Sequence, residues 1–493
     1  MIEPAPYIED CGRLVSHAAN LKFPAILVSC PGAGSCFNRY SVLAANPIGI
    51  LRAQDAESDI TFQSFHPGIP SGSFIDFSHA IRFPLSYFLP PGFANIPWPG
   101  TNLPFYGGWI GGLAYEFGKR FERMPLHPLE NEMPALWFGL YYAAYIADHE
   151  RKEGWYVLRE LLGVSSEHLS HRLQFLRNCV ENAANEEVAT HHLHGARSLP
   201  SNDWTASWTP SLDANDYRSA ANSILTYLQR GDIYQANLTV RYRRKFEGEP
   251  FDLFRSLLKT NPAPLSAFIQ GGNFTLLSSS PELFLNLRND GCMETRPIKG
   301  TIKRDSVENS PLDIDRAETL LKSPKNRAEH LMIVDLERND LGRVCQPGSV
   351  HVDPLIALES VKGLHHLVSS VKGKLKHGLS AADAIAALFP GGSITGAPKI
   401  RAMEIIRELE PVPRGFYTGA IGWITPEGDA RMNLAIRTMT LKDDQLDLQT
   451  GGGIVIDSDP DMEAEERSLK GAAMARAVEE ITNGELRITN YEL

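Results

Sequence analysis

The sequence lacks a long apolar run, an excess of positive charge and a patterned set of cysteines, and each absence argues against a class of protein. The longest apolar stretch, residues 135–147, is too short to cross a bilayer, which takes about 20 residues in a helix. The net charge of −11 argues against nucleic acid or an anionic membrane as the main partner. The 6 cysteines have no metal-ligand spacing and are predicted to be free thiols. Because the first residues are acidic and contain no apolar segment, they do not resemble a signal peptide, and we expect a cytoplasmic protein.

The order of the expected elements indicates an α+β fold. Short strand-like runs bounded by Gly and Pro fill an N-terminal region, residues 1–185. A polar, weakly patterned stretch follows at residues 186–210 and is predicted to be a linker or surface loop. In residues 211–493, hairpin-like strands and separate helices alternate irregularly, which favours α+β over a repeating βαβ pattern.

The last predicted helix, residues 460–483, carries charge on the face that otherwise enters the core. At helical spacing, its apolar face consists of Ala473, Met474, Ala477, Val478 and Ile481. Spacings of three and four residues extend this face back to Glu463, Glu466 and Lys470. Burying such charges is costly unless they meet a metal, a ligand or each other. The alternative is a solvated first turn, where acids favour the positive end of the helix.

A second helix repeats this pattern. It is predicted to begin at Ser323-Pro324, and Glu329 then lies on the face of Met332, Ile333 and Leu336. Two acids from separate helices can hold a hard divalent ion, and Mg2+ prefers a few carboxylates together with ligand oxygens. The alternative is an acid at the edge of the apolar face that reaches water.

Two glycine-rich segments are candidates for the close approach of a ligand. Residues 391–399 (GGSITGAPK) enter a predicted helix, whose first N–H groups can bind an anion. This segment is not a Walker loop, because the spacing and the ending differ. The run Gly451-Gly452-Gly453 follows a strand-like segment and lets a group approach the backbone. A plain turn is the alternative for each segment.

A hairpin is predicted from residue 283 to residue 298, with Asp290-Gly291 as a two-residue turn. In that register Glu282 lies opposite Lys299, and a structural ion pair is the alternative to a functional one. Arg437, in the strand-like run 433–438, can bind a carboxylate through its forked guanidinium, although an isolated Arg is more often a surface residue.

Taken together, these segments resemble the chorismate-binding enzyme family, which includes anthranilate, isochorismate, salicylate and aminodeoxychorismate synthases. The resemblance covers most of the chain and is strongest from Gly231 to Lys470. Its main motifs are GDIYQANLT (231–239), SSSPELF (278–284), RPIKGT (296–301), RAEHLMIVDLERNDLGR (327–343), GLHHLVS (363–369), FPGGSITGAPKIRAMEII (389–406), YTGAIGW (417–423), NLAIRT (433–438) and GGGIV (451–455). The resemblance implies large antiparallel β-sheets packed as a sandwich with helices on the outside, as in anthranilate synthase component I. It also implies a chorismate-binding catalytic domain at residues 211–493.

The resemblance also assigns roles to residues of this sequence. It implies that Glu329 and Glu466 bind Mg2+ directly and that Glu463 binds it through water, so that the metal holds the ring carboxylate of chorismate. The implied cradle for the enolpyruvyl carboxylate consists of Arg437, Tyr417, Lys470, Gly452 and Gly453. The residues implied to line the ring are Thr395, Gly396 and Ala397, with His366 near the ring carboxylate.

Two positions favour one reaction within the family. Lys299 stands where the anthranilate synthase type has Ala, and Gln235 stands where water-adding members have a lysine base. We therefore expect conversion of chorismate and ammonia to 4-amino-4-deoxychorismate, with anthranilate synthesis as the alternative. By resemblance, Lys299 attacks ring carbon 2, Glu282 protonates the hydroxyl that leaves carbon 4, and ammonia attacks carbon 4. This chemistry requires a neutral lysine, so its pKa must be lowered.

The ammonia needs a source. No cysteine lies in a Gly-x-Cys-x-Gly nucleophile turn, so the chain carries no recognisable glutaminase. We therefore expect a separate glutamine amidotransferase subunit as partner, with free ammonia as a substitute. The N-terminal region of this family can also hold tryptophan.

Overall fold

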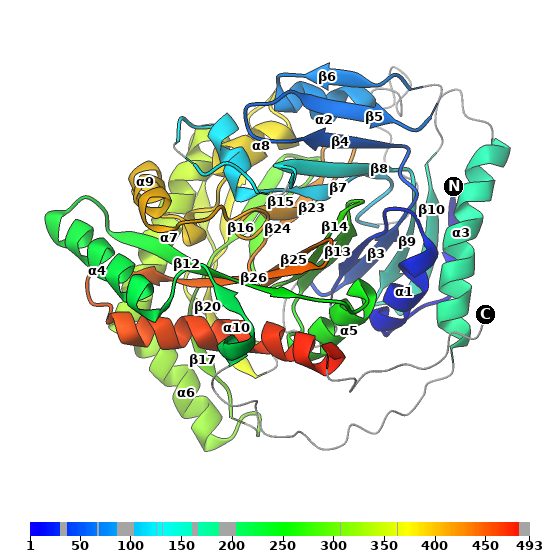
Figure 1. Cartoon of the computed structure of the whole chain (residues 1–493). Coiled ribbons are helices and arrows are strands. Elements are labelled where there is room, and N and C mark those ends of the chain that lie inside the picture. Colours follow the sequence, from blue (N-terminus) through cyan, green and yellow to red (C-terminus); the bar gives the residue numbers. More distant parts are fainter. Residues whose placement is uncertain are drawn as a thin grey trace.

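The computed structural model describes residues 1–29, 37–66, 69–85, 103–124, 126–130, 132–159, 166–186, 204–305, 307–361 and 363–482. In this part of the chain, two large antiparallel sheets and one small sheet are surrounded by helices (Figure 1). The predicted α+β fold with large antiparallel sheets is therefore confirmed. Most of the predicted linker lies outside the described residues, except for its first residue and its last seven, which include the 3-10 helix η3 (Trp204–Ser207).

The first sheet has 12 strands among the described residues. In spatial order they are β1 (Ile2–Ala5), β10 (Glu153–Leu158), β9 (Ala143–Asp148), β3 (Tyr40–Ala44), β2 (Ala25–Val28), β13 (Leu265–Gln270), β14 (Phe274–Ser280), β25 (Thr438–Lys442), β26 (Gln445–Ile454), β12 (Gln235–Lys245) and β11 (Thr209–Pro210). The short strand β22 (Gly396–Ala397) also pairs with β12. Strand β12, near one end of this sheet, pairs with both β22 and β26, and it therefore brings the glycine-rich segments at 391–399 and 451–453 next to each other.

The second sheet has 11 strands in the described part of the chain, and the third has 3. The order of the second is β18 (His351–Val352), β21 (Val371–Lys374), β16 (Cys292–Arg296), β15 (Leu283–Leu287), β24 (Ala430–Leu434), β23 (Ala420–Ile424), β7 (Gly108–Leu113), β8 (Leu136–Tyr141), β4 (Gly49–Ala53), β5 (Ile60–Ser64) and β6 (Gly72–Phe74). The order of the third is β17 (Ile298–Lys303), β20 (Leu364–Val368) and β19 (Ala357–Val361).

The helices lie around these sheets (Figure 1). They are α1 (Cys11–His17), α2 (Phe77–Leu85), α3 (Ser166–Asn185), α4 (Ala214–Arg230), α5 (Pro250–Thr260), α6 (Pro311–Lys322), α7 (Pro324–Val344), α8 (Ala381–Leu388), α9 (Lys399–Leu409) and α10 (Pro460–Thr482). Short 3-10 turns are η1 (Ala18–Asn20), η2 (Tyr115–Arg120) and η4 (Gly392–Ile394). The predicted caps are confirmed at two helices, because Ser323 accepts from the N–H of Asn326 and Asp459 accepts from the N–H of Asp461.

Both large sheets combine strands from the N-terminal and the C-terminal region. In the first sheet β2 pairs with β13, with Val28 opposite Ser266. In the second sheet β7 pairs with β23, with Leu113 opposite Ala420. The two regions predicted from the sequence therefore share their backbone hydrogen bonds and their hydrophobic core.

Aromatic side chains fill the space between the two large sheets. Trp137 on β8 meets Phe274 on β14 edge to face, with ring centroids 6.1 Å apart, and Phe274 stacks on Phe416 at 5.7 Å. Such contacts add to the hydrophobic gain from burying large rings. The apolar stretch 135–147 forms two strands, β8 and β9, which lie in different sheets. The chain therefore crosses from one layer to the other at Tyr142, and both strands are buried.

The hairpin β15–β16 corrects the predicted register. The N–H of Arg288 donates to the carbonyl of Cys292 and the N–H of Gly291 donates to the carbonyl of Arg288, so the loop has one residue more than predicted. Gly291 has φ +84°, as a turn closed by a left-handed residue requires. A bulge shifts the pairing again, so that Leu283 faces Arg296. The chain then leaves the second sheet, and Lys299 lies on β17 of the third sheet, so it is not the cross-strand partner of Glu282.

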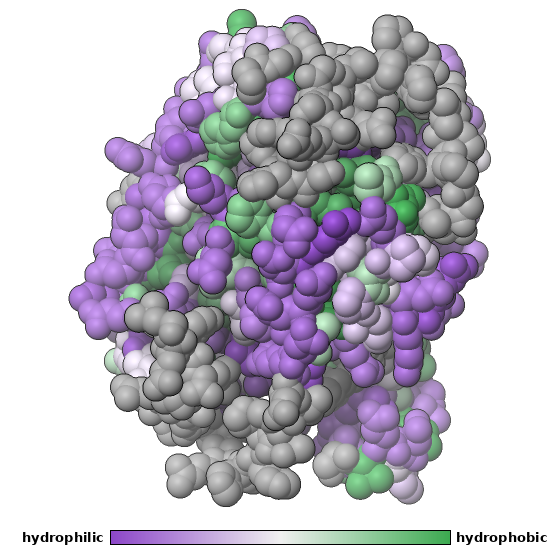
Figure 2. Space-filling view, turned by 90° about the vertical axis from the view of Figure 1, so that its right-hand side faces the viewer, coloured by the Kyte–Doolittle hydropathy of each residue, from purple (hydrophilic) through white to green (hydrophobic). Residues whose placement is uncertain are grey.

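The described surface and cysteines agree with an ordinary globular chain. None of the described helices is long and apolar enough to cross a membrane. The side of the molecule that carries α3 is mostly hydrophilic where it is coloured in Figure 2. Cys11, Cys179, Cys292 and Cys345 are free thiols, and the other cysteines, Cys30 and Cys36, lie outside the described residues.

Candidate active site

The predicted nucleophile and the predicted acid lie close together although they belong to different sheets. Lys299 is near the start of β17, and Glu282 lies between β14 and β15 with 4% of its surface exposed. The hydroxyl of Ser393 donates to Glu282 Oε1 at 2.6 Å. The positive charge of Lys299 stabilises the ionised form of Glu282, and the negative charge of Glu282 does the same for Lys299.

Burial shifts the pKa values of these two residues in opposite directions. Burial raises the pKa of Glu282 to about 7, although Ser393 and Lys299 work against this shift. Burial and the nearby charge of Lys470 lower the pKa of Lys299, against the carboxylates of Glu329, Glu282 and Glu466. Burial therefore favours the protonated form of the acid and the neutral form of the amine, which are the forms that acid catalysis beside a nitrogen nucleophile requires.

The segment 391–397 forms a wall of the site in front of helix α9. The hydroxyl of Thr395 donates to the carbonyl of Gly391 at 3.0 Å, so it is used inside the loop. Gly396 has φ +146°, and a Cβ there would lie 2.1 Å from the carbonyl oxygen of Gln235. Ala397 pairs with Gln235 across β22 and β12. Helix α9 begins at Lys399, whose amine binds Asp340 at 2.6 Å, and binding of an anion by the first N–H groups of this helix stays a prediction.

Gln235 is a fully buried polar side chain at this wall. It is 0% exposed, and neither amide atom has a hydrogen-bond partner among the described residues. A Cβ on Gly453 would lie 2.9 Å from this amide, so only glycine leaves room for it. A buried amide without partners is costly and therefore favours a polar ligand at this point.

Gly452 and Gly453 lie on β26, opposite Leu238 and Asn237 of β12. A Cβ on Gly452 would lie 3.2 Å from Glu463 Oε2 and 3.7 Å from Lys470 Nζ. The absence of side chains here therefore opens a space bordered by a carboxylate, an amine and the backbone of β26, as the predicted cradle requires.

Arg437 lies in the turn between β24 and β25, although the sequence predicted a strand there. It has φ +50°, and its Nη1 donates to Asn261 Oδ1 at 3.3 Å. Burial lowers its pKa, and Glu282 opposes this shift. Arg437 has no ion-pair partner in the part of the chain that the structure describes, which leaves its guanidinium available to a carboxylate.

Tyr417 and His366 also offer polar atoms. Burial raises the pKa of the Tyr417 hydroxyl, so the hydroxyl stays protonated and can donate. His366 is 3% exposed, its Nδ1 lies 2.8 Å from the hydroxyl of Thr301, and its Nε2 has no partner among the described residues. Burial and the charge of Arg437 lower the pKa of His366 to about 3, so the ring is neutral.

The three acids predicted to bind metal are neighbours, but they do not converge. Burial raises the pKa of Glu329, and the charges of Glu463 and Glu466 raise it further, so the three carboxylates share one region. Across the described ranges, no three His, Cys, Asp or Glu side chains are grouped closely enough to hold a metal ion. Glu463 is 7% exposed, whereas the side chain of Glu466 is 59% exposed and that of Lys470 is 39% exposed. The prediction that all three charges of α10 continue its buried face is therefore wrong for Glu466 and Lys470.

The reason is the direction of the buried stripe of α10. It runs through Glu463, Arg467, Gly471, Met474 and Val478, so that Glu466 and Lys470 lie at its border. Arg467 is a charged member of this stripe that was not predicted from the sequence. Its guanidinium lies 4.4 Å from the ring centre of Tyr217, which compensates its burial in part.

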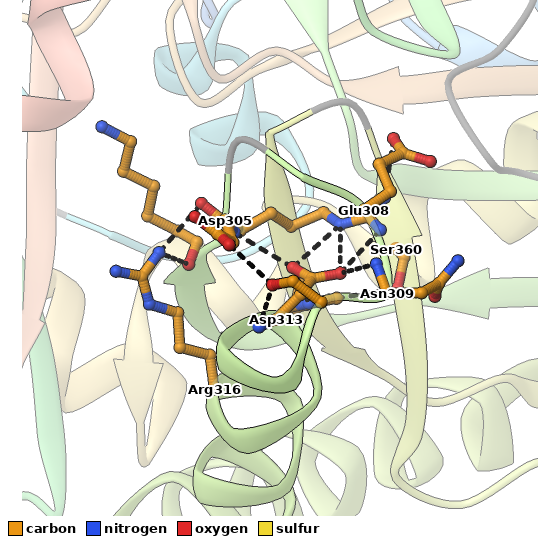
Figure 3. Close-up of polar contacts among 10 residues, drawn as sticks. Asp305, Glu308, Asn309, Asp313, Arg316 and Ser360 are labelled. Atoms are coloured by element: carbon orange, nitrogen blue, oxygen red, sulfur yellow. Dashed lines mark hydrogen bonds and ion pairs between the residues drawn. The ribbon is translucent and has the colours of Figure 1, made fainter.

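Sequence reasoning also missed a polar network that supports the third sheet (Figure 3). Asp313 at the start of α6 accepts from Arg304 Nη2 at 2.8 Å and from the N–H groups of Asp305 and Asn309. Its other contact is His365 Nε2 at 3.1 Å. Arg304 holds the pKa of the Asp313 carboxyl well below its usual range. Because β17 carries Lys299 and β20 carries His366, this network fixes the sheet that holds both residues. The Ser310 cap before Asp313 was a visible signal for it.

A second missed network supports the wall at 391–397. The guanidinium of Arg414 binds Glu410 at 2.7 Å and donates to the carbonyls of Ile394 and Asn237. Both side chains are almost fully buried, so the pair is satisfied by several hydrogen bonds at once. It joins the loop next to Thr395 to the strand that carries Gln235.

Comparisons with known proteins agree with this geometry. Residues 80–476 match the family model described as chorismate binding enzyme. Over 371 residues the chain is 41% identical to aminodeoxychorismate synthase component 1 of Klebsiella aerogenes, covering 75% of this chain and 77% of the relative. Over 446 residues it is 34% identical to the Bacillus subtilis protein of the same name, covering 90% and 89%. The crystal structure of anthranilate synthase component I from Streptococcus pneumoniae is 30% identical, has a TM-score of 0.70, and is matched over 89% of this chain and 92% of that chain.

The chain therefore belongs to the chorismate-binding enzyme family. The relatives that match it over most of their length include proteins named aminodeoxychorismate synthase component 1. The predicted fold and the predicted family are both confirmed, and the individual site residues stay predictions.

Proposed function

We propose that the chain is component 1 of an aminodeoxychorismate synthase and converts chorismate and ammonia to 4-amino-4-deoxychorismate, the precursor of p-aminobenzoate and folate. The observation that carries this proposal is the proximity of Lys299 to the buried Glu282, with pKa values shifted in the directions that the chemistry needs. Anthranilate synthase relatives share the fold. Lys299 is the residue that favours amination at carbon 4.

In this mechanism the neutral amine of Lys299 attacks ring carbon 2. The ring double bonds shift, and the carbon 4 hydroxyl leaves as water with the proton of Glu282. Ammonia then attacks carbon 4, the double bonds shift back, and the bond between Lys299 and carbon 2 breaks. The ionised Glu282 then takes up the proton that the added ammonia loses, so the acid is restored for the next cycle.

In this proposal the enolpyruvyl carboxylate is held by Arg437, Tyr417 and the backbone of Gly452 and Gly453. The guanidinium of Arg437 supplies the charge, and the Tyr417 hydroxyl supplies a neutral donor. The neutral His366 presents its free Nε2 toward the ring carboxylate. Thr395, Gly396 and Ala397 form the wall against which the ring lies.

We also propose a Mg2+ site made by Glu329, Glu463 and Glu466. Carboxylate oxygens from two helices are the donors that Mg2+ prefers, and their mutual repulsion is relieved by a cation. When bound, the metal would neutralise and orient the ring carboxylate of chorismate. Lys470 must move away from Glu466 before that acid can bind a metal.

The ammonia would come from a separate glutamine amidotransferase subunit. We therefore expect glutamine alone to be unproductive with this chain. Turnover on glutamine without a partner would show that the chain itself releases ammonia from glutamine, and it would contradict this part of the proposal. A cytoplasmic location and tryptophan binding in the N-terminal region stay predictions from the sequence.

The test is to incubate the purified chain with chorismate, Mg2+ and ammonium at mildly alkaline pH and to identify the product by chromatography. 4-Amino-4-deoxychorismate is the expected product. Anthranilate or isochorismate would overturn the assignment drawn from Lys299 and Gln235.

A further inference from the structure

Two residues that the proposed function gives to different ligands bind each other in this structure. Lys470 Nζ lies 2.8 Å from Glu466 Oε1 and donates to the carbonyl of Gly451 at 3.3 Å. In the proposed function Glu466 binds the metal and Lys470 binds the enolpyruvyl carboxylate. The second acid of α10 is also engaged, because the hydroxyl of Ser458 donates to Glu463 Oε1 at 2.6 Å. Both acids of α10 are therefore engaged by other groups of the chain in this structure.

The pair is placed so that either ligand must disturb it. Glu466 and Lys470 are one helical turn apart on α10, and Lys470 Nζ would lie 3.7 Å from a Cβ on Gly452. Their partly exposed side chains can be reached from solvent. Glu463 Oε2 would lie 3.2 Å from the same Cβ, so Lys470 is also close to the second acid of α10. The positive charge of Lys470 therefore lies where it would repel a cation bound to both acids.

We propose that the Lys470–Glu466 ion pair is a latch that couples metal binding to chorismate binding. This inference rests on the proposed function. A metal that binds first must pull Glu466 away from Lys470, and it meets the positive charge of that lysine. Chorismate that binds first draws Lys470 to its carboxylate and releases Glu466. The ligand that binds first loses part of its binding free energy in breaking the Lys470–Glu466 pair. The ligand that binds second finds the pair already broken and therefore binds more tightly.

Positive coupling between the two ligands follows, and it must be reciprocal. The free protein then binds a divalent metal weakly, and the metal site forms together with the substrate site. A divalent cation alone therefore leaves most of the protein free to bind chorismate.

The direct test measures Mn2+ binding to the full chain without chorismate, by electron paramagnetic resonance of the free ion. Loss of the exposed ion pair alone should raise the affinity for Mn2+ by a factor of about 1.5–5. Removing the neighbouring positive charge adds to this factor, so we expect Lys470→Met to bind Mn2+ roughly tenfold more tightly than the wild type. Lys470→Arg keeps the charge and should stay near the wild-type affinity. The matched control is Lys322→Met, which breaks a Glu318–Lys322 pair of the same spacing at 2.6 Å on α6 and should leave Mn2+ binding unchanged.

The coupling itself is measured without ammonia in a Lys299→Ala background, where we expect chorismate to bind and its conversion to be at least about a hundredfold slower. Chorismate should tighten Mn2+ binding in this variant. Adding Lys470→Met should make this effect of chorismate on Mn2+ binding smaller. The reduction should equal about the factor by which Lys470→Met tightens Mn2+ binding when chorismate is absent. Thermal unfolding of each variant shows that it is folded before the titrations are compared.

The outcomes separate this inference from the function on which it rests. Glu466→Gln should lose Mn2+ affinity with and without chorismate. If it does, and Lys470→Met binds Mn2+ like the wild type, the latch is refuted while the metal site stands. If Glu466→Gln leaves Mn2+ binding unchanged, the metal assignment of the proposed function is itself wrong.

Discussion

Replacing Ser393 by Ala should move the pH range in which the enzyme works. The Ser393 hydroxyl donates to Glu282 Oε1 at 2.6 Å, and this bond stabilises the ionised form of the acid. A hydrogen bond to a charged group contributes about 1.5–3 kcal/mol, and one pKa unit corresponds to about 1.4 kcal/mol. Loss of the bond should therefore raise the pKa of Glu282 from about 7 by a further 1–2 units, roughly.

The sign of the effect on activity follows from the role of Glu282. A general acid must carry its proton, and the fraction that does falls as pH rises through its pKa. With the higher pKa of the variant, the decline of activity at alkaline pH should begin about 1–2 units later. The ratio of variant to wild-type kcat/KM should therefore rise with pH above neutrality.

The assay compares both proteins at the same ammonium concentration over a range of pH. The changing fraction of free ammonia then cancels in the ratio. Ser256→Ala is the matched control, because Ser256 is also buried and donates to a glutamate, Glu480, at 2.7 Å far from the site. It should leave the profile unmoved. A ratio for Ser393→Ala that is constant or falls with pH would refute the assignment of Glu282 as the acid.

Three further predictions concern the site and the fold. Lys299→Ala should lower amination roughly a hundredfold or more while chorismate binding, measured by calorimetry, is retained; full activity would remove the covalent role. Arg437→Ala should weaken chorismate binding by about 10- to 150-fold, because it removes a charge-assisted hydrogen bond, and an unchanged KM would contradict the carboxylate cradle. Met474→Ala should cost about 2–5 kcal/mol of unfolding free energy in a denaturant titration, because Met474 is 1% exposed in the stripe of α10. Met462→Ala on the same helix, where Met462 is 70% exposed, should change it by less than about 0.5 kcal/mol.

Local signals predicted the helices of the site well. Ser323 and Asp459 cap α7 and α10 as expected, since a cap depends on a few neighbouring residues. The family motifs then placed Lys299, Glu282, Gln235 and the acids in one region, although they come from distant parts of the chain.

Features that depend on long-range packing were not predicted. The Asp290-Gly291 pair indicated a two-residue turn, but the loop has one residue more, and a separate bulge in β15, which also pairs with β24, shifted the register again. Arg437 adopts φ +50° because the chain must turn there from one large sheet to the other. The contact of Ser393 with Glu282 was not predicted, because the two residues are far apart in the sequence and periodicity carries no information on such a contact.

The shared sheets have a consequence for how this protein is made. While the N-terminal region leaves the ribosome, β2 and β7 have no partners on the edges that later meet β13 and β23. Unpaired strand edges are templates for wrong pairing, and non-local pairing is slow to form. Neither layer can close before β23 has been synthesised, so the emerging chain has to be kept from aggregating until most of it is present. Expressed alone, residues 1–185 should accumulate as insoluble material, whereas co-expression with residues 211–493 offers both open edges their natural partners.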